Sequence, residues 1–312
     1  MHMKEVSMGR SKKPDLVSGV IVIDKHPGVT SHRIVQILRK LYDTPRVGHT
    51  GTLDPMATGV LPILLGRAAK ASDFVTAGEK EYDAVLHLGI TTDTQDVTGA
   101  VLSECDGIPE EAEVRKAIQS FVGDIAQIPP MYSAIKVDGQ KLVDAARRGE
   151  VVERAPRPVH IDSICITPLT ERDYRLQVVC SKGTYIRTLC ADIGEKLGCG
   201  GAMGALRRVR SGSFTLKDAV TIEQLEAASM EERISMVRPC DTLFSHCPAL
   251  TVNDFQAKLV RGGTELYQNK LGTRFPVETL VRLYQKGVFF ALGEVKDFPN
   301  GSAIKPIRLF VL

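Results

Sequence analysis

The most informative stretch of the chain reads Gly48-His49-Thr50-Gly51-Thr52-Leu53-Asp54-Pro55-Met56-Ala57-Thr58-Gly59-Val60-Leu61, followed by the apolar Pro62-Ile63-Leu64-Leu65. Glycine permits backbone conformations that other residues avoid, and it lets a ligand approach the chain closely. Pro55 fixes its own φ and pushes Asp54 towards an extended conformation. Two interpretations follow: a turn in which the Asp54 side chain bonds its own backbone, or a stiff loop that presents one acid to a substrate. Taken alone, these residues favour the turn.

Two common phosphate-binding motifs are excluded for this stretch. No Gly-Lys-Ser or Gly-Lys-Thr follows the glycines, so the segment is not a Walker-type loop. The spacing of the glycines also differs from that of a dinucleotide-binding fingerprint.

The composition is that of an ordinary soluble globular protein. Of the 312 residues, 43% are hydrophobic and 25% are charged, which suits one large domain and one small domain. No apolar run is long enough to span a bilayer, and the N-terminus lacks the apolar segment of a secretory signal. The seven cysteines are scattered without a Cys-x-x-Cys pair, which argues against structural zinc and for free thiols in a reducing cytoplasm.

The net charge of +3 is carried by the N-terminal tail. Residues 1–14 contain four basic residues and one acidic residue, so the rest of the chain is balanced. Attraction to a polyanion must then depend on how charge is arranged locally. The segment from Cys199 to Lys217 has four basic residues, no acidic residue and several glycines, and it is predicted to contact phosphates. A second basic cluster, within 133–160, is interpreted as a solvated helix face.

Hydrophobic periodicity predicts alternating strands and helices in the larger part of the chain. The predicted strands are 19–24, 82–89, 161–167 and 174–180, and the predicted helices are about 31–41, 109–121 and 186–197. Thr221 and Gln224 have the spacing of a capping box that opens another helix. Residues 124–158 contain Pro129-Pro130 and Asp138-Gly139 among polar residues. They are expected to form an insertion with its own small helix rather than part of the core.

A second unit is predicted beyond Pro248. A helix over 252–260, a hairpin between 281–284 and 288–292, and a last strand over 307–312 indicate a small β-rich domain suited to binding. The expected organisation is a disordered basic tail at 1–17, a large domain at 18–247 and the small domain at 248–312.

The segment Gly48–Pro55 resembles the signature of the TruB-type tRNA pseudouridine synthases, which isomerise uridine 55 in the T arm of tRNA. Further matches follow in the family's order: 19–31, Lys80-Glu81-Tyr82, 92–96 with Gly99, 130–136, 180–187 and 205–208. The resemblance covers about residues 18–312 and overrides the turn interpretation of Asp54. It implies an α+β fold with a mixed, largely antiparallel central sheet flanked by helices, and a C-terminal barrel similar to a PUA RNA-binding domain. One departure is the proline after Lys25, which comes one place later than usual.

The resemblance implies that Asp54 is the catalytic carboxylate and that Arg187 pairs with it. A nearby positive charge favours the ionised form of a buried acid. Tyr82 matches the tyrosine that stacks on the flipped uracil, and its hydroxyl is expected to help move a proton. Three chemical routes stay open, because Asp54 could attack C1′, remove the C2′ proton or add to C6 of the base.

The remaining matches are substrate-binding residues. Tyr185 matches a second active-site tyrosine, His49 matches the histidine that fills the space left by the flipped base, and Leu206 matches an apolar wall of the uracil pocket. Arg207 and Arg208 belong to the segment predicted to contact phosphates. For Tyr185 and Leu206 an ordinary role as a buried side chain is nearly as compatible with the sequence.

The resemblance implies that the partner is the T stem-loop of tRNA. No cofactor and no metal are expected, because the reaction is redox-neutral and no ligand cluster is apparent. The chain is expected to act as a cytoplasmic monomer, away from membranes and without an obligatory protein partner. Two alternatives stay open: a tRNA-folding factor whose catalysis is secondary, and a guide-RNA-dependent synthase that would need protein partners.

Overall fold

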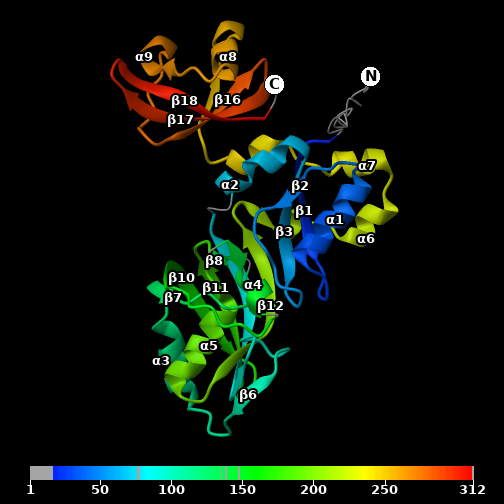
Figure 1. Cartoon of the computed structure of the whole chain (residues 1–312), viewed down its shortest axis with the longest axis vertical. Helices are drawn as coiled ribbons and strands as arrows, with labels where there is room; N and C mark the ends of the chain where they lie inside the picture. The colour runs from blue at the N-terminus through cyan, green and yellow to red at the C-terminus, as the bar shows by residue number, and fades with distance from the viewer. Residues whose placement is uncertain (1–16, 76–77, 134, 138, 147, 311–312) are drawn as a thin grey trace, which may run out of the picture.

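The computed structural model describes residues 17–75, 78–133, 135–137, 139–146 and 148–310. Almost all of the predicted tail, residues 1–17, therefore lies outside the described residues. Its last residue, Val17, is buried against the body, so the folded part begins one residue earlier than expected. Figure 1 shows a long body that contains one large sheet, with a smaller sheet at one end.

The central sheet contains nine strands within the described residues. They are β1 (Gly19–Lys25), β2 (Val47–His49), β3 (Thr58–Leu65), β4 (Lys80–Leu88), β7 (Gly123–Gln127), β10 (Arg157–Pro168), β11 (Asp173–Cys180), β12 (Gly201–Ser211) and β13 (Phe214–Thr215). The order is β1-β3-β12-β4-β11-β10-β7, with β2 on β3 and β13 on β12. All pairings are antiparallel except β3 with β12, which confirms the predicted mixed and largely antiparallel sheet.

Helices flank this sheet, as expected for an α+β fold. The main ones are α1 (Ser31–Leu41), α3 (Glu111–Gln119), α5 (Ile186–Leu197), α6 (Ile222–Ala227) and α7 (Met230–Ser235). Thr30 caps α1 by accepting a hydrogen bond from the Arg33 amide, and Thr221 and Gln224 form the predicted capping box of α6. Shorter elements are α2 (Ser72–Val75), β5 (Ile90–Thr92), β6 (Val101–Glu104) and the 3₁₀ turns Gly66–Ala71, Leu216–Asp218 and Cys240–Phe244.

Strands β1 and β3 are buried on both faces, which explains their continuous apolar sequences. In β1, Ile21 and Ile23 join the core beneath the helices, whereas Val20 and Val22 join a second core on the opposite face. The parallel contact of β3 with β12 requires glycine at position 59. Gly59 has φ +100, and a Cβ there would collide with the backbone carbonyl of Arg208.

The predicted insertion is shorter than expected. Residues 123–127 form β7, which pairs with β10 at the edge of the central sheet, so they belong to the core fold. The alternation of polar and apolar residues, interpreted as an insertion, is that of an edge strand with one exposed face. The middle of the segment does carry a small helix, α4 (Leu142–Ala146), next to the two-residue strands β8 (Lys136–Val137) and β9 (Gln140–Lys141).

The C-terminal part forms a separate five-stranded sheet among the described residues. Its elements are β14 (Ala249–Thr251), α8 (Asp254–Arg261), β15 (Leu266–Tyr267), α9 (Gln268–Leu271), β16 (Leu280–Gln285), β17 (Val288–Phe298) and β18 (Gly301–Leu309). The predicted helix and the β16–β17 hairpin are confirmed. The last strand was placed too late, because β18 begins at Gly301 and pairs along β17 from there.

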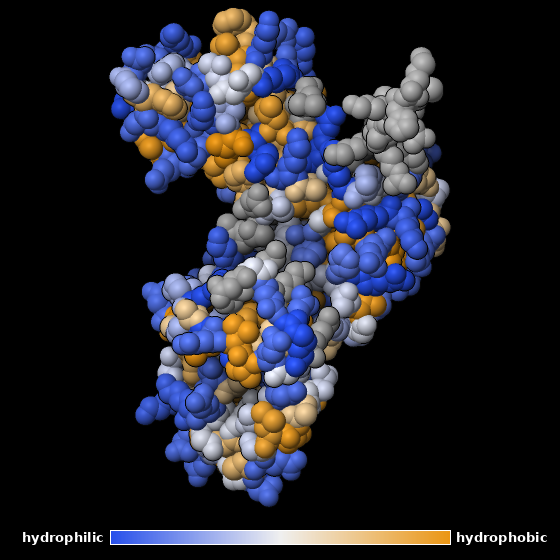
Figure 2. Space-filling model, viewed as in Figure 1, coloured by the Kyte–Doolittle hydropathy of each residue, from blue (hydrophilic) through white to orange (hydrophobic). Residues whose placement is uncertain are grey.

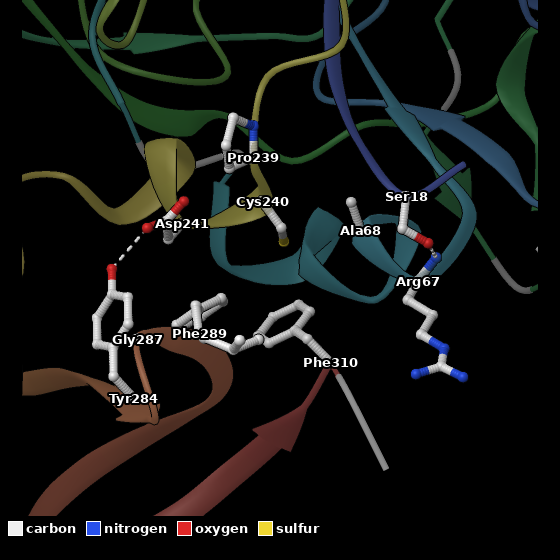
Figure 3. A pocket seen from close by; sticks show the side chains of 11 residues that line it. Ser18, Arg67, Ala68, Pro239, Cys240, Asp241, Tyr284, Gly287, Phe289 and Phe310 are labelled. Atoms are coloured by element: carbon white, nitrogen blue, oxygen red, sulfur yellow. Dashed lines mark hydrogen bonds between the residues drawn. The ribbon is translucent and has the colours of Figure 1, made fainter. Parts of the chain in front are cut away.

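Aromatic side chains join the C-terminal sheet to the body. The ring of Phe289 lies 6.1 Å from that of Phe244 and 5.1 Å from that of Phe310. Tyr284 donates a hydrogen bond of 2.6 Å to Asp241 beside a hollow of about 550 Å³ (Figure 3). Hydrophilic residues cover most of the face seen in Figure 2, and no described helix is long and apolar enough to cross a membrane.

Candidate active site

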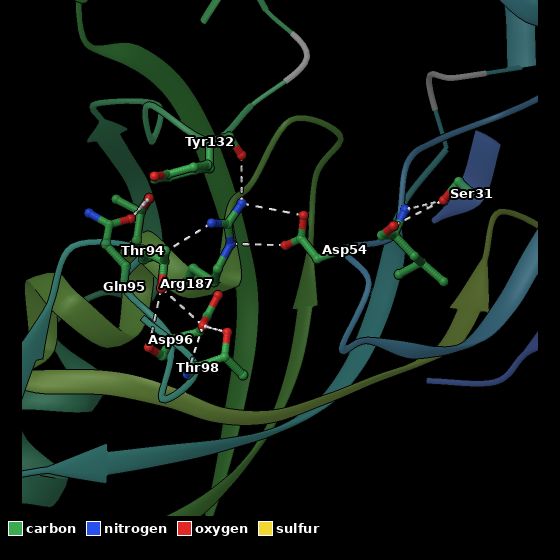
Figure 4. Close-up of polar contacts among 10 residues, drawn as sticks. Ser31, Asp54, Thr94, Gln95, Asp96, Thr98, Tyr132 and Arg187 are labelled. Carbon is green, nitrogen blue, oxygen red and sulfur yellow. Dashed lines mark hydrogen bonds and ion pairs between the residues drawn. The ribbon is translucent and has the colours of Figure 1, made fainter. Parts of the chain in front are cut away.

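The Asp54 loop connects β2 to β3, and the first residue of helix α1 holds its backbone. Ser31, the first residue of α1, donates from Oγ to the Leu53 carbonyl at 3.0 Å and accepts from the Leu53 amide at 2.8 Å (Figure 4). The Ala57 amide bonds the Asp54 carbonyl at 3.1 Å, so the backbone does turn here. The carboxylate, however, forms its ion pair with a distant arginine, as the loop interpretation requires.

A buried lysine fixes the other side of the loop. Lys25 is fully buried and donates from Nζ to the carbonyl oxygens of Pro55 at 3.1 Å, Val29 at 2.8 Å and His26 at 3.0 Å. The Gly28 amide also bonds the Pro55 carbonyl at 2.8 Å. The late proline in this turn therefore leaves Lys25 able to anchor the loop.

Asp54 and Arg187 form a two-pronged ion pair. Arg187 Nε lies 2.9 Å from Asp54 Oδ2, and Arg187 Nη2 lies 3.3 Å from Asp54 Oδ1 (Figure 4). Arg187 is the second residue of α5 and its side chain is only 5% exposed, whereas the Asp54 side chain is 32% exposed. The guanidinium is thus held inside the protein, while part of the carboxylate faces open space.

Two backbone carbonyls orient Arg187. Its Nη1 donates to the Thr94 carbonyl at 3.0 Å and its Nη2 to the Tyr132 carbonyl at 2.8 Å. The Thr94 loop is held by the buried Asp96, whose Oδ1 accepts from the Thr98 amide at 3.0 Å. Thr94, Asp96 and Tyr132 lie in segments that match the family, but the sequence indicated no role for them. A carbonyl acceptor depends on the path of the backbone, and no side-chain pattern encodes that path.

Opposing effects act on the acidity of Asp54. Burial raises the pKa of this carboxyl above its usual range, and the nearby charge of Asp96 raises it further. The Arg187 charge and hydrogen bond and, more weakly, the Lys25 charge lower the pKa and favour the ionised form. Asp54 is therefore a carboxylate of increased basicity whose negative charge is kept by a fixed counter-ion.

Tyr82 and Leu206 lie on adjacent strands, β4 and β12, in the same hydrophobic cluster. They are 7% and 8% exposed, respectively. Burial raises the pKa of the Tyr82 hydroxyl, and the charge of Arg208 opposes this rise. The Asp54 charge adds to the rise in the pKa of the Tyr82 hydroxyl.

His49 and Tyr185 are the two remaining aromatic residues predicted for the site. The His49 Nδ1 atom is buried and has no hydrogen-bond partner within the described residues, and burial lowers the pKa of the ring, which favours the neutral form. Tyr185 directly precedes α5. Its amide donates to Gln127 Oε1 at 2.9 Å, and the Gln127 amide group donates back to the Tyr185 carbonyl at 3.2 Å. The sheet edge thereby fixes the start of the helix that carries Arg187.

The predicted phosphate-contacting segment differs from expectation. Arg208 is 1% exposed and donates to the carbonyls of Val60 at 2.7 Å and Gly51 at 3.2 Å, so the prediction that it contacts a phosphate is wrong. Arg210 pairs with two glutamates, and Arg207 lies 2.7 Å from Asp24. The segment is strand β12, and pairing with neighbouring strands supplies acids that the local sequence lacks.

No metal-binding cluster occurs in the part of the chain that the structure describes: no group of three or more His, Cys, Asp or Glu side chains could hold an ion. The seven cysteines are all free thiols.

Comparison with known proteins identifies the class of this fold and site. A solved Cbf5-Nop10-Gar1 complex contains a chain similar to this one, with a TM-score of 0.72 and 27% identity over 94% of this chain and 85% of that chain. The H/ACA RNP bound to a substrate RNA containing 2′-deoxyuridine gives a TM-score of 0.71 at 25% identity, with the same coverage. The fold is that of a pseudouridine synthase, and the Asp54–Arg187 pair lies within it.

Sequence comparison identifies the family. Residues 39–186 match the N-terminal domain of the TruB family pseudouridylate synthases, and residues 187–245 match the tRNA pseudouridylate synthase B C-terminal domain. The chain is 43% identical to tRNA pseudouridine synthase B of Aromatoleum aromaticum, covering 94% of this chain and 93% of the relative. It is 44% identical to that of Alkaliphilus oremlandii, covering 94% and 98%. The chain belongs to the TruB family of pseudouridylate synthases.

Proposed function

We propose that this protein converts uridine 55 of the tRNA T arm to pseudouridine, with Asp54 as the catalytic carboxylate. The observation that carries the proposal is the two-pronged pair of Asp54 with the buried Arg187 at 2.9 and 3.3 Å. A fixed guanidinium favours the ionised acid and opposes the rise in its pKa that burial causes. The names of the curated relatives supply the tRNA substrate and the isomerisation.

The reaction breaks the C1′–N1 bond, turns the uracil and rejoins it through C5. The base must first leave the stack of the T loop, because its reacting atoms are shielded there. Attack at C1′, removal of the C2′ proton and addition at C6 all begin at the same carboxylate, and each needs the ionised Asp54.

The other site residues bind and orient the base. Tyr82 stacks on the flipped uracil and its hydroxyl moves the C5 proton, while Leu206 forms an apolar wall beside it. Tyr185 closes the pocket at the start of α5. His49 occupies the space that the flipped base leaves in the RNA, and burial lowers the pKa of its ring, which favours the neutral form. Arg207, whose side chain is 40% exposed, reaches the RNA backbone from the rim.

The remaining features complete the proposal. Residues 17–247 form the catalytic domain and residues 248–312 form a PUA-like RNA-binding domain, and the basic residues that precede residue 17 add positive charge for RNA binding. The enzyme works in the cytoplasm as a monomer without a protein partner. The similar Cbf5 structure is a complex with Nop10 and Gar1. Measuring the activity of the purified chain on tRNA alone therefore distinguishes an enzyme that acts by itself from one that needs protein partners.

Asp54→Asn tests the function. The amide keeps the shape of the side chain and removes its charge, so we expect pseudouridine formation on a T-arm transcript to fall by more than about 10³-fold, with RNA binding largely kept. Asp24→Asn is the matched control, because Asp24 pairs with an arginine at 2.7 Å outside the Asp54 loop. Substantial residual activity of Asp54→Asn would reject Asp54. If the same variant loses tRNA refolding as well as catalysis, the separate folding role is also rejected.

A further inference from the structure

Lys80 is a buried lysine that no step of the proposed reaction uses. It lies on β4 two residues before Tyr82, and therefore on the same face of the strand. Lys80 is 9% exposed, and its Nζ donates to the Gly78 carbonyl at 3.1 Å. Within the described residues no carboxylate forms an ion pair with it. A buried ammonium of this kind has lost hydration without gaining an anionic partner.

The surroundings of Lys80 are themselves positively charged. Burial, together with the charges of Arg208 and Lys182, lowers the pKa of Lys80 to about 8, while Cys180 has the opposite effect. Arg208 is committed to backbone carbonyls and brings no acid with it. At neutral pH this end of the site therefore holds an excess of positive charge.

Lys80 borders the Asp54 loop at Gly51. A Cβ on Gly51 would lie 3.6 Å from Lys80 Cε and 3.6 Å from Arg208 Nη1, which is ordinary contact distance, and its φ is not positive. Neither backbone conformation nor packing therefore requires glycine here, and the bare backbone leaves room for a ligand. Three residues of chain span at most about 10–11 Å, so Gly51 is within reach of the nucleotide on which Asp54 acts.

We propose that Lys80, supported by the charge of Arg208, is a binding subsite for one backbone phosphate beside the target uridine. The ammonium is a compact point charge that suits a phosphate oxygen, and the phosphate supplies the anionic partner that the described residues lack. Holding the backbone there keeps the nucleotide in place while its base is turned out. The identity of this RNA rests on the proposed function.

The test combines charge removal on both molecules. Binding of a T-arm RNA is measured with three proteins that all carry Asp54→Asn, so that the RNA is not converted. The first keeps Lys80, the second also carries Lys80→Met, and the third also carries Lys80→Arg. The exposed Lys116→Met on α3 is the matched control for loss of one lysine. Each protein is tested with the normal RNA and with RNAs that carry one uncharged methylphosphonate on the 5′ or the 3′ side of the target uridine.

We expect Lys80→Met to weaken binding roughly tenfold and to reduce the slope of log K against log salt by about 0.7–0.9, with Lys80→Arg close to the parent. In the protein that keeps Lys80, one of the two methylphosphonates should weaken RNA binding by about the same factor as Lys80→Met does. The same methylphosphonate should not weaken RNA binding by the Lys80→Met protein any further. The proposal would be overturned if the loss of affinity from Lys80→Met and the loss from a methylphosphonate added together at both positions. A Lys80→Met effect no larger than that of Lys116→Met would also overturn it. Pseudouridine formation by the unaltered chain is measured on the same RNA. Its absence would reject the proposed function, while the binding comparison would still decide on the phosphate subsite.

Discussion

Two of the aspartate–arginine pairs in the larger, N-terminal part of the molecule differ in the burial of the arginine. Asp54 pairs with Arg187 at 2.9 Å, and Asp24 pairs with Arg207 at 2.7 Å. The two aspartates have similarly exposed side chains, 32% and 28%. The Arg187 side chain is 5% exposed, whereas that of Arg207 is 40% exposed.

This difference separates a fixed counter-ion from an ordinary surface pair. Arg187 also donates to the carbonyls of Thr94 and Tyr132, so its position does not depend on Asp54 alone. Arg207 has one further contact, at 3.3 Å to the Thr58 hydroxyl. Water screens the exposed pair and reduces its value, while the buried guanidinium keeps a strong field on its acid. Distance between charged atoms is therefore a poor guide to what an ion pair does.

The largest expected effect comes from Arg187→Met. It leaves Asp54 without its counter-ion, so activity on T-arm RNA should fall by more than about 10²-fold. The folded state should lose about 2–3 kcal/mol, less than the ~3–5 kcal/mol typical of a fully buried pair, because Asp54 is partly exposed. Pseudouridine assays and urea denaturation measure the two effects. Activity within threefold of the parent would mean that the two pairs are equivalent.

A smaller effect is expected on pH dependence. Burial raises the pKa of Asp54 above 3.8, so kcat/KM should be full at neutral pH and fall as the pH drops through an apparent pKa above 3.8. Because the folded state favours the protonated acid, this group's contribution to stability is greatest at low pH and is lost as the pH rises through the raised pKa.

Arg187→Lys should move this acid limb to higher pH, because a lysine cannot reproduce the two-pronged contact. Asp24→Asn should leave the limb in place. An apparent pKa of 3.8 or lower for the acid limb of kcat/KM would contradict the proposed role of Arg187. A shift of this limb to lower pH in Arg187→Lys would contradict it as well.

The smallest effect is expected for Arg207→Met. Removing this half-exposed arginine should cost about 0–1 kcal/mol of stability and leave the pH profile unchanged. If Arg207 contacts an RNA phosphate, the salt slope of binding should fall by about 0.7–0.9. Thermal denaturation and binding titrations at several salt concentrations measure both. An unchanged slope would remove Arg207 from the RNA-binding residues.

The local sequence predicted helices and strands well where the hydrophobic residues followed a single helical or strand periodicity. The helix at 186–197, the capping box at Thr221 and the β16–β17 hairpin all follow from residues close in the chain. Position 123–127 was misinterpreted because a polar–apolar edge strand looks like a polar insertion until its partner β10 is known. The strand β18 was placed late because its first residues, from Gly301, are not strongly apolar.

The site residues divide in the same way. Asp54 stands out from its glycine-rich surroundings, but Arg187 was indicated by family resemblance and not by spacing, since 133 residues separate the two. Arg208 was misassigned because its neighbours in sequence are basic and glycine-rich, whereas its neighbours in space are the carbonyls of Gly51 and Val60. Lys80 belongs to the matched segment Lys80-Glu81-Tyr82, but the sequence indicated no role for it.

The sequence by itself determined the Asp54 loop, the apolar strand that follows it and the alternation of helices and strands. These depend on backbone dihedrals and on the side-chain period, which are properties of neighbouring residues. Only the tertiary structure decided which charged side chains contact one another. The parallel pairing of β3 with β12 buries Arg208 beneath the loop, and the docking of α5 brings Arg187 to Asp54. Pairing and burial fix the dielectric and the partners of each charge, and these decide what an ionisable group can do.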